Sequence, residues 1–218
     1  EFGVVLIDIG GGTTDVAVFY GGTLRYTAEI GIAGNHITTD IATALKISNA
    51  EAEELKKRFG CAKASLIEGD NEIIPQVRTA SGATIQVSRQ QIAEVIQDRL
   101  EELFQQVKAE LINSKLHTSH YSLLGVGSVL TGGTSELIGI EELASEILEL
   151  PVRKGNVINI KGGLSDMLRS PIYATGVGLS LYSVRTISST KKSRFRIRDR
   201  GFFSRVRERM ASWFGSLF

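Results

Sequence analysis

The sequence contains a single cysteine, Cys61, among 218 residues. No intrachain disulfide can form, and one lone thiol is typical of a protein from a reducing compartment. No run of 18 apolar residues occurs, so no membrane-spanning helix is expected, and no signal-peptide pattern opens the sequence. With 42% hydrophobic and 22% charged residues, the composition is that of a globular protein with length for one large or two small domains.

The net charge of +1 combines two regions of opposite sign. Residues 191–218 hold nine Lys/Arg against two acidic residues, a balance of +7, so the remaining residues carry −6. An acidic body with a basic tail predicts that the tail meets an anionic partner. No nucleic-acid partner is expected. The sequence starts at Glu1, without Met and directly before an apolar run, which predicts a fragment of a longer protein.

The segment Val4–Tyr20 is typical of a β-hairpin with an anion-binding tip. Apolar residues at 4–7 and at 16–19 predict two buried strands, and glycines and threonines lie between them. Consecutive glycines free the backbone amides to surround an anion, and threonines add hydroxyl donors. The tip residues are Gly10, Gly11, Gly12, Thr13 and Thr14.

Asp8 and Asp15 flank this tip and supply the oxygen ligands or water-orienting groups that a magnesium-bound phosphate requires. The segment is neither a Walker loop, which ends in Gly-Lys-Ser/Thr, nor a dinucleotide fingerprint, whose last glycine opens a helix. The alternative is a glycine-rich β-turn with no ligand.

The run from Asp8 to Asp15, Asp-Ile-Gly-Gly-Gly-Thr-Thr-Asp, resembles the second phosphate motif of the actin, heat-shock chaperone and sugar-kinase superfamily. The resemblance implies an α/β fold with an actin-like, ribonuclease H-like sheet. It also implies that ATP lies between two halves of the protein, each gripping the phosphates with such a hairpin. Asp8 would then hold Mg²⁺ through water, and Asp15 would orient the attacking water.

Two further segments are expected at the nucleotide. A helix over residues 49–59, capped by Ser48, carries Glu53 and Lys56 one turn apart. Its Ala-Glu-x-x-Lys pattern resembles the helix with which bacterial actins hold ribose and adenine, and a solvated salt-bridged helix is the alternative. A strand over 121–130 runs into the superfamily's adenosine motif, and a helix is expected from about 135 to 149. The motif residues with a proposed nucleotide role are Gly132, Gly133 and the adjoining Thr134.

A hairpin is expected over residues 72–87, followed by a long helix that begins at Ser88 and carries an apolar stripe to Leu111. Together with several short motifs, this organisation resembles the FtsA family of bacterial cell-division proteins over residues 1–182, the second half of that fold. The motifs are Gly60-Cys61-Ala62, residues 89–96, Leu130-Thr131-Gly132-Gly133, Pro151-Val152-Arg153 and residues 170–179.

The resemblance divides the chain into four parts. Residues 1–33 and 119–183 form the sheet subdomain, and 34–118 form an inserted α+β subdomain on the nucleotide and FtsZ side. Contacts with the C-terminal peptide of FtsZ, the tubulin-like division protein, transfer to Arg99 and Glu102 on the long helix. An ordinary intrahelical ion pair is the alternative for these two residues.

The last two parts are a basic linker over 184–200 and a membrane-targeting amphipathic helix over 201–218. On a helical wheel, large apolar residues of the latter gather on one side and arginines and serines on the other. A basic helix rich in Trp and Phe is typical of a segment that lies in an anionic membrane surface, and docking on the protein's own core is the alternative. The apolar residues are Phe202, Phe203, Val206, Met210, Trp213, Phe214, Leu217 and Phe218.

The function implied is that of an ATP-binding protein that assembles into filaments and tethers FtsZ to the cytoplasmic face of the inner membrane at the division site. The sequence is compatible with slow ATP hydrolysis by the complete protein but does not fix its rate, and no activity is expected of the fragment. The alternatives are a pilus-assembly actin homologue, which would lack the terminal helix, and another ATPase or kinase of the superfamily, which would need a catalytic base in a substrate cleft.

Overall fold

The computed structural model describes residues 3–67, 73–79, 81–114, 127–158, 160 and 167–190. Residues 1–177 form one compact unit and residues 178–218 form a second. Within the first unit lie a five-stranded sheet, the helices that cover it, and a separate two-stranded hairpin.

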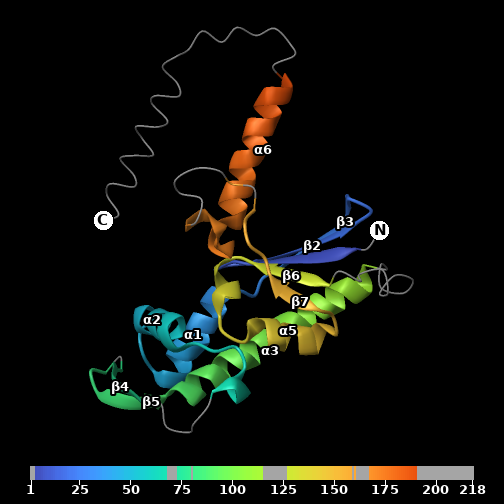
Figure 1. Ribbon diagram of the computed structural model, residues 1–218. Coiled ribbons are helices and arrows are strands. Elements are labelled where there is room, and N and C mark those ends of the chain that lie inside the picture. Colours follow the sequence, from blue (N-terminus) through green and yellow to red (C-terminus); the bar gives the residue numbers. More distant parts are fainter. Residues whose placement is uncertain are drawn as a thin grey trace, which may run out of the picture. The chain divides into compact units, whose positions relative to one another are not determined.

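The sheet has the strand order β3-β2-β1-β6-β7 (Figure 1). The antiparallel strands β1 (Val4–Ile9), β2 (Thr14–Tyr20) and β3 (Thr23–Ile30) follow one another along the chain. The strands β6 (Ser128–Thr131) and β7 (Val152–Lys154) run parallel to β1. Among its described residues, the segment between β3 and β6 contains three α-helices and the two-stranded hairpin. Its assignment to an inserted subdomain stays a prediction.

The crossover begins with α1 (Gly34–Leu45) and α2 (Asn49–Phe59). Ser48 accepts a hydrogen bond from Glu51 N and caps α2, as its sequence predicts. The predicted hairpin forms from β4 (Ile73–Arg78) and β5 (Thr84–Ser88). It leads into α3 (Arg89–Asn113), where Ser88 and Gln91 form a reciprocal capping box.

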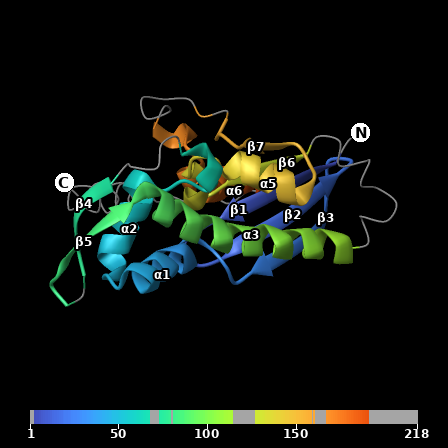
Figure 2. The ribbon, with the colours of Figure 1, turned by 90° about the horizontal axis from the view of Figure 1, so that it is seen from below.

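Within the first unit, the long helix α3 extends from the group formed by α1, α2 and the β4–β5 hairpin to the five-stranded sheet (Figure 2). Its N-terminal end lies beside α1, α2 and the β4–β5 hairpin, and its C-terminal half lies along the sheet. There the hydroxyl of Tyr26 on β3 donates to Glu110 Oε2 at 2.5 Å, and this hydrogen bond raises the pKa of Tyr26. Part of the helix therefore packs on the sheet, although the predicted boundaries assign the whole helix to the insertion; those boundaries stay a prediction.

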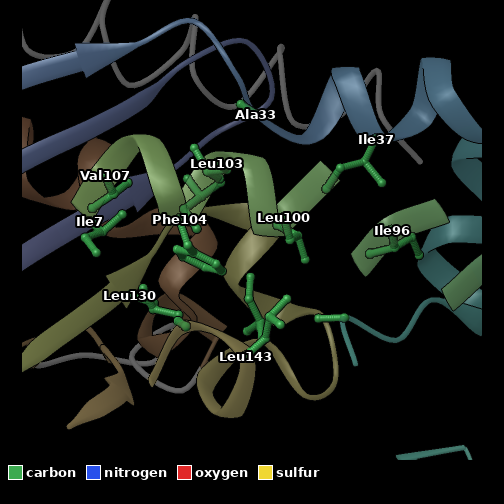
Figure 3. Packing of buried hydrophobic residues seen from close by; sticks show 14 of the residues in the cluster. Ile7, Ala33, Ile37, Ile96, Leu100, Leu103, Phe104, Val107, Leu130 and Leu143 are labelled. Atoms are coloured by element: carbon green, nitrogen blue, oxygen red, sulfur yellow. The ribbon is translucent and has the colours of Figure 1, made fainter. Parts of the chain in front are cut away.

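The core forms where the apolar stripe of α3 meets the sheet (Figure 3). Phe104 and Leu100 on α3 are fully buried, and Ile7 of β1, Leu130 of β6 and Leu143 lie around them. Full burial of a large apolar side chain stabilises a fold by about 1.5–3 kcal/mol. The alternation along β1 turns Ile7 and Ile9 into this core and Asp8 toward the opposite face of the sheet.

Beyond β6 the backbone departs from the predicted single helix over 135–149. A 3₁₀ turn, η3 (Gly133–Glu136), comes first, and α5 (Ile140–Leu148) starts only after Gly139, which has φ +78°. Glycine takes this left-handed conformation without strain, so the chain turns there before the helix begins. The predicted strand over 121–130 is described only from Ser128, because residues 115–126 lie outside the described part.

The last described elements are η4 (Met167–Arg169), η5 (Pro171–Tyr173) and α6 (Ala174–Thr190). Ser170 caps the start of η5, with Pro171 in first position, as predicted. The helix continues through Thr190, so residues 184–190 of the predicted linker are helical. The rest of the linker and the amphipathic helix lie outside the described residues. No helix among the described residues is long and apolar enough to span a membrane.

A glycine-lined cleft with two carboxylates

A cleft of about 370 Å³ lies where the β1–β2 loop approaches the loop after β6. Its lining brings together most of the residues predicted to hold phosphate and adenosine. Those predicted residues are Asp8, Gly10, Gly11, Gly12, Thr13, Asp15, Gly132 and Gly133, and the cleft is completed by Ile172 and Thr175.

The two carboxylates of the cleft lie opposite each other on neighbouring strands. Asp8 of β1 pairs with Asp15 of β2 in the antiparallel register, so both side chains project from the same face of the sheet. Like charges placed directly opposite destabilise a sheet, and none of the ten residues that line the cleft is basic. A bound divalent cation would offset this repulsion.

The glycines that line the cleft differ in why a glycine suits the position. Gly132 has φ +85°, and a Cβ there would lie 2.4 Å from both Asp8 Oδ1 and Ile9 O, so only glycine fits. Gly12 and Gly133, by contrast, would place a Cβ more than 4 Å from any protein atom. The backbone at these two positions therefore borders open space, as close approach to a ligand requires.

Thr14 and Thr134 are not among the residues that line the cleft. Strand β2 begins at Thr14, and because neighbouring residues of a strand face opposite sides, its side chain lies on the core face when Asp15 lies on the other. The Thr14 hydroxyl is fully buried and donates to Ile32 O at 2.7 Å. The Thr134 hydroxyl donates to Gly10 O at 2.9 Å and ties the two glycine loops together. The Thr14 hydroxyl is thus not directed at the cleft, in contrast to its predicted role as a donor to an anion. The nucleotide-binding role predicted for Thr134 stays a prediction.

Glu53 and Lys56 also lie behind the cleft rather than in its lining. Lys56 Nζ donates to Gly34 O at 2.9 Å, to Thr38 Oγ1 at 2.8 Å and to Glu53 Oε2 at 2.7 Å. Partial burial opposes the ionisation of Glu53, but hydrogen bonds from Lys56 and Thr38 outweigh it and lower its pKa to about 2. All three ammonium hydrogens are thus used within the protein, and any nucleotide role of this pair stays a prediction.

The start of α1 joins Lys56 and its hydrogen-bond partners to the glycine loop between β1 and β2. Gly34 N donates to Gly10 O at 3.1 Å, and Asn35 N donates to Gly11 O at 2.8 Å. A Cβ on Gly34 would lie 2.5 Å from Thr134 Oγ1, so this position leaves no room for a larger residue. Lys56 therefore supports the loop through Gly34 without touching the cleft.

Among the described residues no group of three or more His, Cys, Asp or Glu side chains is placed to hold a metal ion. Asp8 and Asp15 nevertheless fit Mg²⁺, which is usually bound by one or two carboxylates together with waters and substrate phosphates. The side chains present suit a metal that arrives with its phosphate ligand.

Sequence reasoning missed two residues of the cleft, Ile172 and Thr175, which come from η5 and the first turn of α6. The Thr175 hydroxyl donates to Asp8 Oδ2 at 2.6 Å across 167 positions of sequence. Thr175 stood within a motif used for the family resemblance, but no local pattern indicates a contact over such a separation.

Arg99 and Glu102, predicted to contact FtsZ, lie on α3 in a second groove of about 380 Å³. Arg99 Nη1 donates to Glu102 Oε2 at 2.5 Å, which is the intrahelical pair given above as the alternative. Asp40 of α1 binds the same guanidinium. The groove is lined by Asp40, Thr43, Ala44, Val95, Asp98, Arg99 and Glu102, so three carboxylates surround one cation.

The strand order, the glycine hairpin and the adenosine-type loop together define an actin-like ATPase fold. The chain resembles MreB5 of Spiroplasma citri bound to AMPPNP, with a TM-score of 0.63 and 22% identity over 86% of this chain and 55% of that one. It also resembles the PilM–PilN type IV pilus biogenesis complex, with a TM-score of 0.61 and 20% identity over 84% of this chain and 46% of that one.

The family model for cell division protein FtsA matches residues 5–178. The FtsA protein of Pseudomonas aeruginosa is 48% identical over 185 residues, covering 85% of this chain and 43% of the relative. FtsA of Escherichia coli K12 is 40% identical over 188 residues, covering 84% of this chain and 44% of the relative. The chain belongs to the FtsA family. It spans less than half the length of these relatives.

Proposed function

We propose that this chain supplies one wall of a Mg·ATP site in a complete FtsA-family protein. The observation that carries the proposal is the cleft itself, in which two glycine-rich loops meet two opposed carboxylates and no basic residue contributes to the lining. Such a wall would repel a bare polyphosphate and accept one that carries a divalent cation. Bound Mg²⁺ would neutralise phosphate charge, while Asp8 and Asp15 orient the metal's waters and the attacking water.

The test is calorimetric titration of ATP with Mg²⁺. We expect weak or no binding by this chain alone and micromolar binding by the full-length protein, because half of the phosphate grip lies in the other half of the fold. Tight binding by the isolated chain would contradict the shared site.

The blocking variant for this test is Gly12→Val. Gly12 lines the cleft, and a Cβ there meets no protein atom within 4 Å, so the larger side chain intrudes on ligand space without a clash. Gly31→Val is the matched control, since Gly31 has the same open surroundings and lies outside the cleft. In the full-length protein, ATP binding is expected to fall at least tenfold in Gly12→Val and to persist in the control. Equal binding by both variants would place the nucleotide elsewhere.

We further propose that the α1–α3 groove is the docking surface for the FtsZ C-terminal peptide. Three carboxylates against one guanidinium favour a peptide segment that presents a basic side chain beside apolar ones. An acidic segment would have to displace Asp40 from Arg99.

Self-assembly and membrane attachment complete the proposed role. In this scheme the protein forms filaments, and the helix predicted over residues 201–218 attaches them to an anionic membrane at the division site. Support comes from the cell-division family and from the basic, aromatic-rich tail sequence. The experiment that tests the membrane step is described with the last prediction of the Discussion.

A further inference from the structure

We propose that Thr175 is a positioning residue that fixes the Asp8 carboxylate for the metal of the bound nucleotide. This inference rests on the nucleotide site proposed above. It concerns a residue of the cleft wall that the phosphate and adenosine motifs do not include.

The Asp8 carboxylate has a protein group next to each of its oxygens. Oδ2 accepts the Thr175 hydroxyl at 2.6 Å, within the range of a charge-assisted hydrogen bond. Oδ1 lies against the backbone of Gly132, where a Cβ would come within 2.4 Å. The carboxylate is therefore clamped between the start of α6 on one side and the loop after β6 on the other, although Asp8 is only half-buried.

Thr175 is itself placed by the segment that completes the cleft. Gly132 N and Thr131 Oγ1 both donate to Pro171 O, at 3.2 and 3.3 Å. Ser170 Oγ accepts from Ile172 N at 3.3 Å and caps the turn that leads into Ala174. The segment 170–175 is thus bonded to the same loop that presses on Asp8 Oδ1, so both sides of the clamp belong to one connected element.

The clamp matters because Asp8 faces Asp15 without a basic residue in the lining. Fixing the orientation of a carboxylate beside a second carboxylate favours binding of a cation between or near them. The single hydroxyl hydrogen of Thr175 occupies only one lone pair of Oδ2, so this oxygen can still accept a hydrogen bond from a water of a hydrated Mg²⁺. Partners that orient a metal-binding carboxylate in this way commonly contribute about 10- to 100-fold to metal affinity.

The competing interpretation is purely structural: the hydrogen bond would simply hold the first turn of α6 against β1. That role would act equally on nucleotide with and without metal. The two interpretations therefore differ in the metal dependence of binding and not in its overall strength.

The experiment measures the Mg²⁺ concentration that gives half-maximal ATP binding by the full-length protein, together with ATP binding in EDTA. Thr175→Val keeps the shape and removes the hydroxyl, Thr175→Ser keeps the hydroxyl, and Thr84→Val makes the same exchange at an exposed position on β5. We expect a rise of about 10- to 100-fold in the half-maximal Mg²⁺ concentration for Thr175→Val only. Binding in EDTA should be unchanged, and Thr175→Ser should stay within about threefold of the parent, as expected when the donor is retained.

A Thr175→Val protein with the parent's metal requirement would overturn the inference. An equal loss in EDTA and in Mg²⁺, or a loss that Thr175→Ser shares in full, would also overturn it and assign the residue a structural role. If the parent protein binds no ATP under either condition, the proposed nucleotide site fails as well, and this outcome is distinct because it appears before any substitution is made.

Discussion

Asp40 on α1 and Arg99 on α3 form a two-bond ion pair, with Arg99 Nε 2.6 Å from Asp40 Oδ2 and Nη2 3.0 Å from Oδ1. These hydrogen bonds to Asp40 raise the pKa of Arg99, with a smaller contribution from the charge of Glu102. The guanidinium joins two helices, and it is therefore both a surface feature and a brace between them. A substitution of Arg99 can therefore change peptide binding, the contact between α1 and α3, or both.

Arg99→Glu is expected to weaken binding of the FtsZ C-terminal peptide about 10-fold or more, because it breaks the Asp40 ion pair that joins α1 to α3 and sets two carboxylates against each other across the groove. Peptide binding to the full-length protein is measured by fluorescence anisotropy, with Arg25→Glu on the exposed strand β3 as the control. Unchanged affinity would show that the transfer of FtsZ contacts to this helix is wrong.

Asp40→Asn separates the two roles of Arg99. It weakens the contact between α1 and α3 by about 0.2–1 kcal/mol, since one partner of a partly exposed ion pair becomes neutral. It also frees the guanidinium, so an acidic peptide is expected to bind this variant better and a basic one worse. Thermal unfolding gives the stability change, and titration with peptides of both charges gives the preference of the groove.

The low pKa of Glu53 predicts a pH-dependent contribution to stability. In the folded protein the pKa is about 2, below the ordinary value of 4.5, so ionised Glu53 favours the folded state above pH 4.5. Between pH 4.5 and 2 the unfolded chain binds the proton first, and the contribution disappears. Because about a third of the side chain is exposed, we expect no more than about 1 kcal/mol.

Glu53→Gln should therefore lower the free energy of unfolding at pH 7 and cease to matter near pH 2. Urea unfolding of both proteins across this range measures the difference. Glu54→Gln, next to it on α2 and outside the Lys56 cluster, is the control. A difference that grows as the pH falls would contradict the assigned hydrogen bonds.

Replacing the two glycines that follow β6 by alanine is expected to have opposite effects on the stability of the protein. Gly132→Ala should cost about 2–5 kcal/mol, because φ +85° strains an L-residue and the new Cβ meets Asp8 and Ile9 at 2.4 Å. Gly133→Ala has open space at a helical position and should be neutral or stabilising by up to about 1 kcal/mol. Thermal unfolding of the two variants tests the contrast, and equal losses would contradict it.

Elements with a local cause could be predicted from sequence. Ser48 and Ser88 mark the starts of α2 and α3, and the alternating and 3.6-residue patterns place the sheet core and the apolar face of α3. The glycine loop was likewise predicted, because its residues lie together in the sequence. Such features depend on near neighbours, whose preferences the sequence displays directly.

Features set by long-range contacts could not be predicted. The hydroxyl of Thr14 faces the core because β2 starts two residues earlier than expected, and Lys56 is held by Gly34 and Thr38 rather than by the cleft. Thr175 meets Asp8 only after the chain returns to the sheet. In each case a donor has several acceptors within reach, and packing of distant segments decides among them.

The terminal segment gives the last prediction. Burial of one large apolar side chain yields about 1.5–3 kcal/mol, and each basic residue near an anionic leaflet adds about 1 kcal/mol. Ordering about seventeen residues costs roughly 1–2 kcal/mol each, so a single helix should bind weakly. Filaments would present many helices at high effective concentration, so attachment should be strong only for the assembled protein.

Trp213→Glu places a charge in the predicted apolar face and should release the full-length protein from anionic liposomes, while its thermal unfolding stays unchanged. Ser212→Glu is the matched control, because it adds the same charge on the predicted polar face and leaves the apolar residues intact. Co-sedimentation measures both variants, with neutral beads correcting for pelleting of filaments alone. Release by Ser212→Glu to the same extent would show that charge alone, and not burial of the apolar face, accounts for the attachment. Full co-sedimentation of Trp213→Glu would refute burial of this face in the membrane.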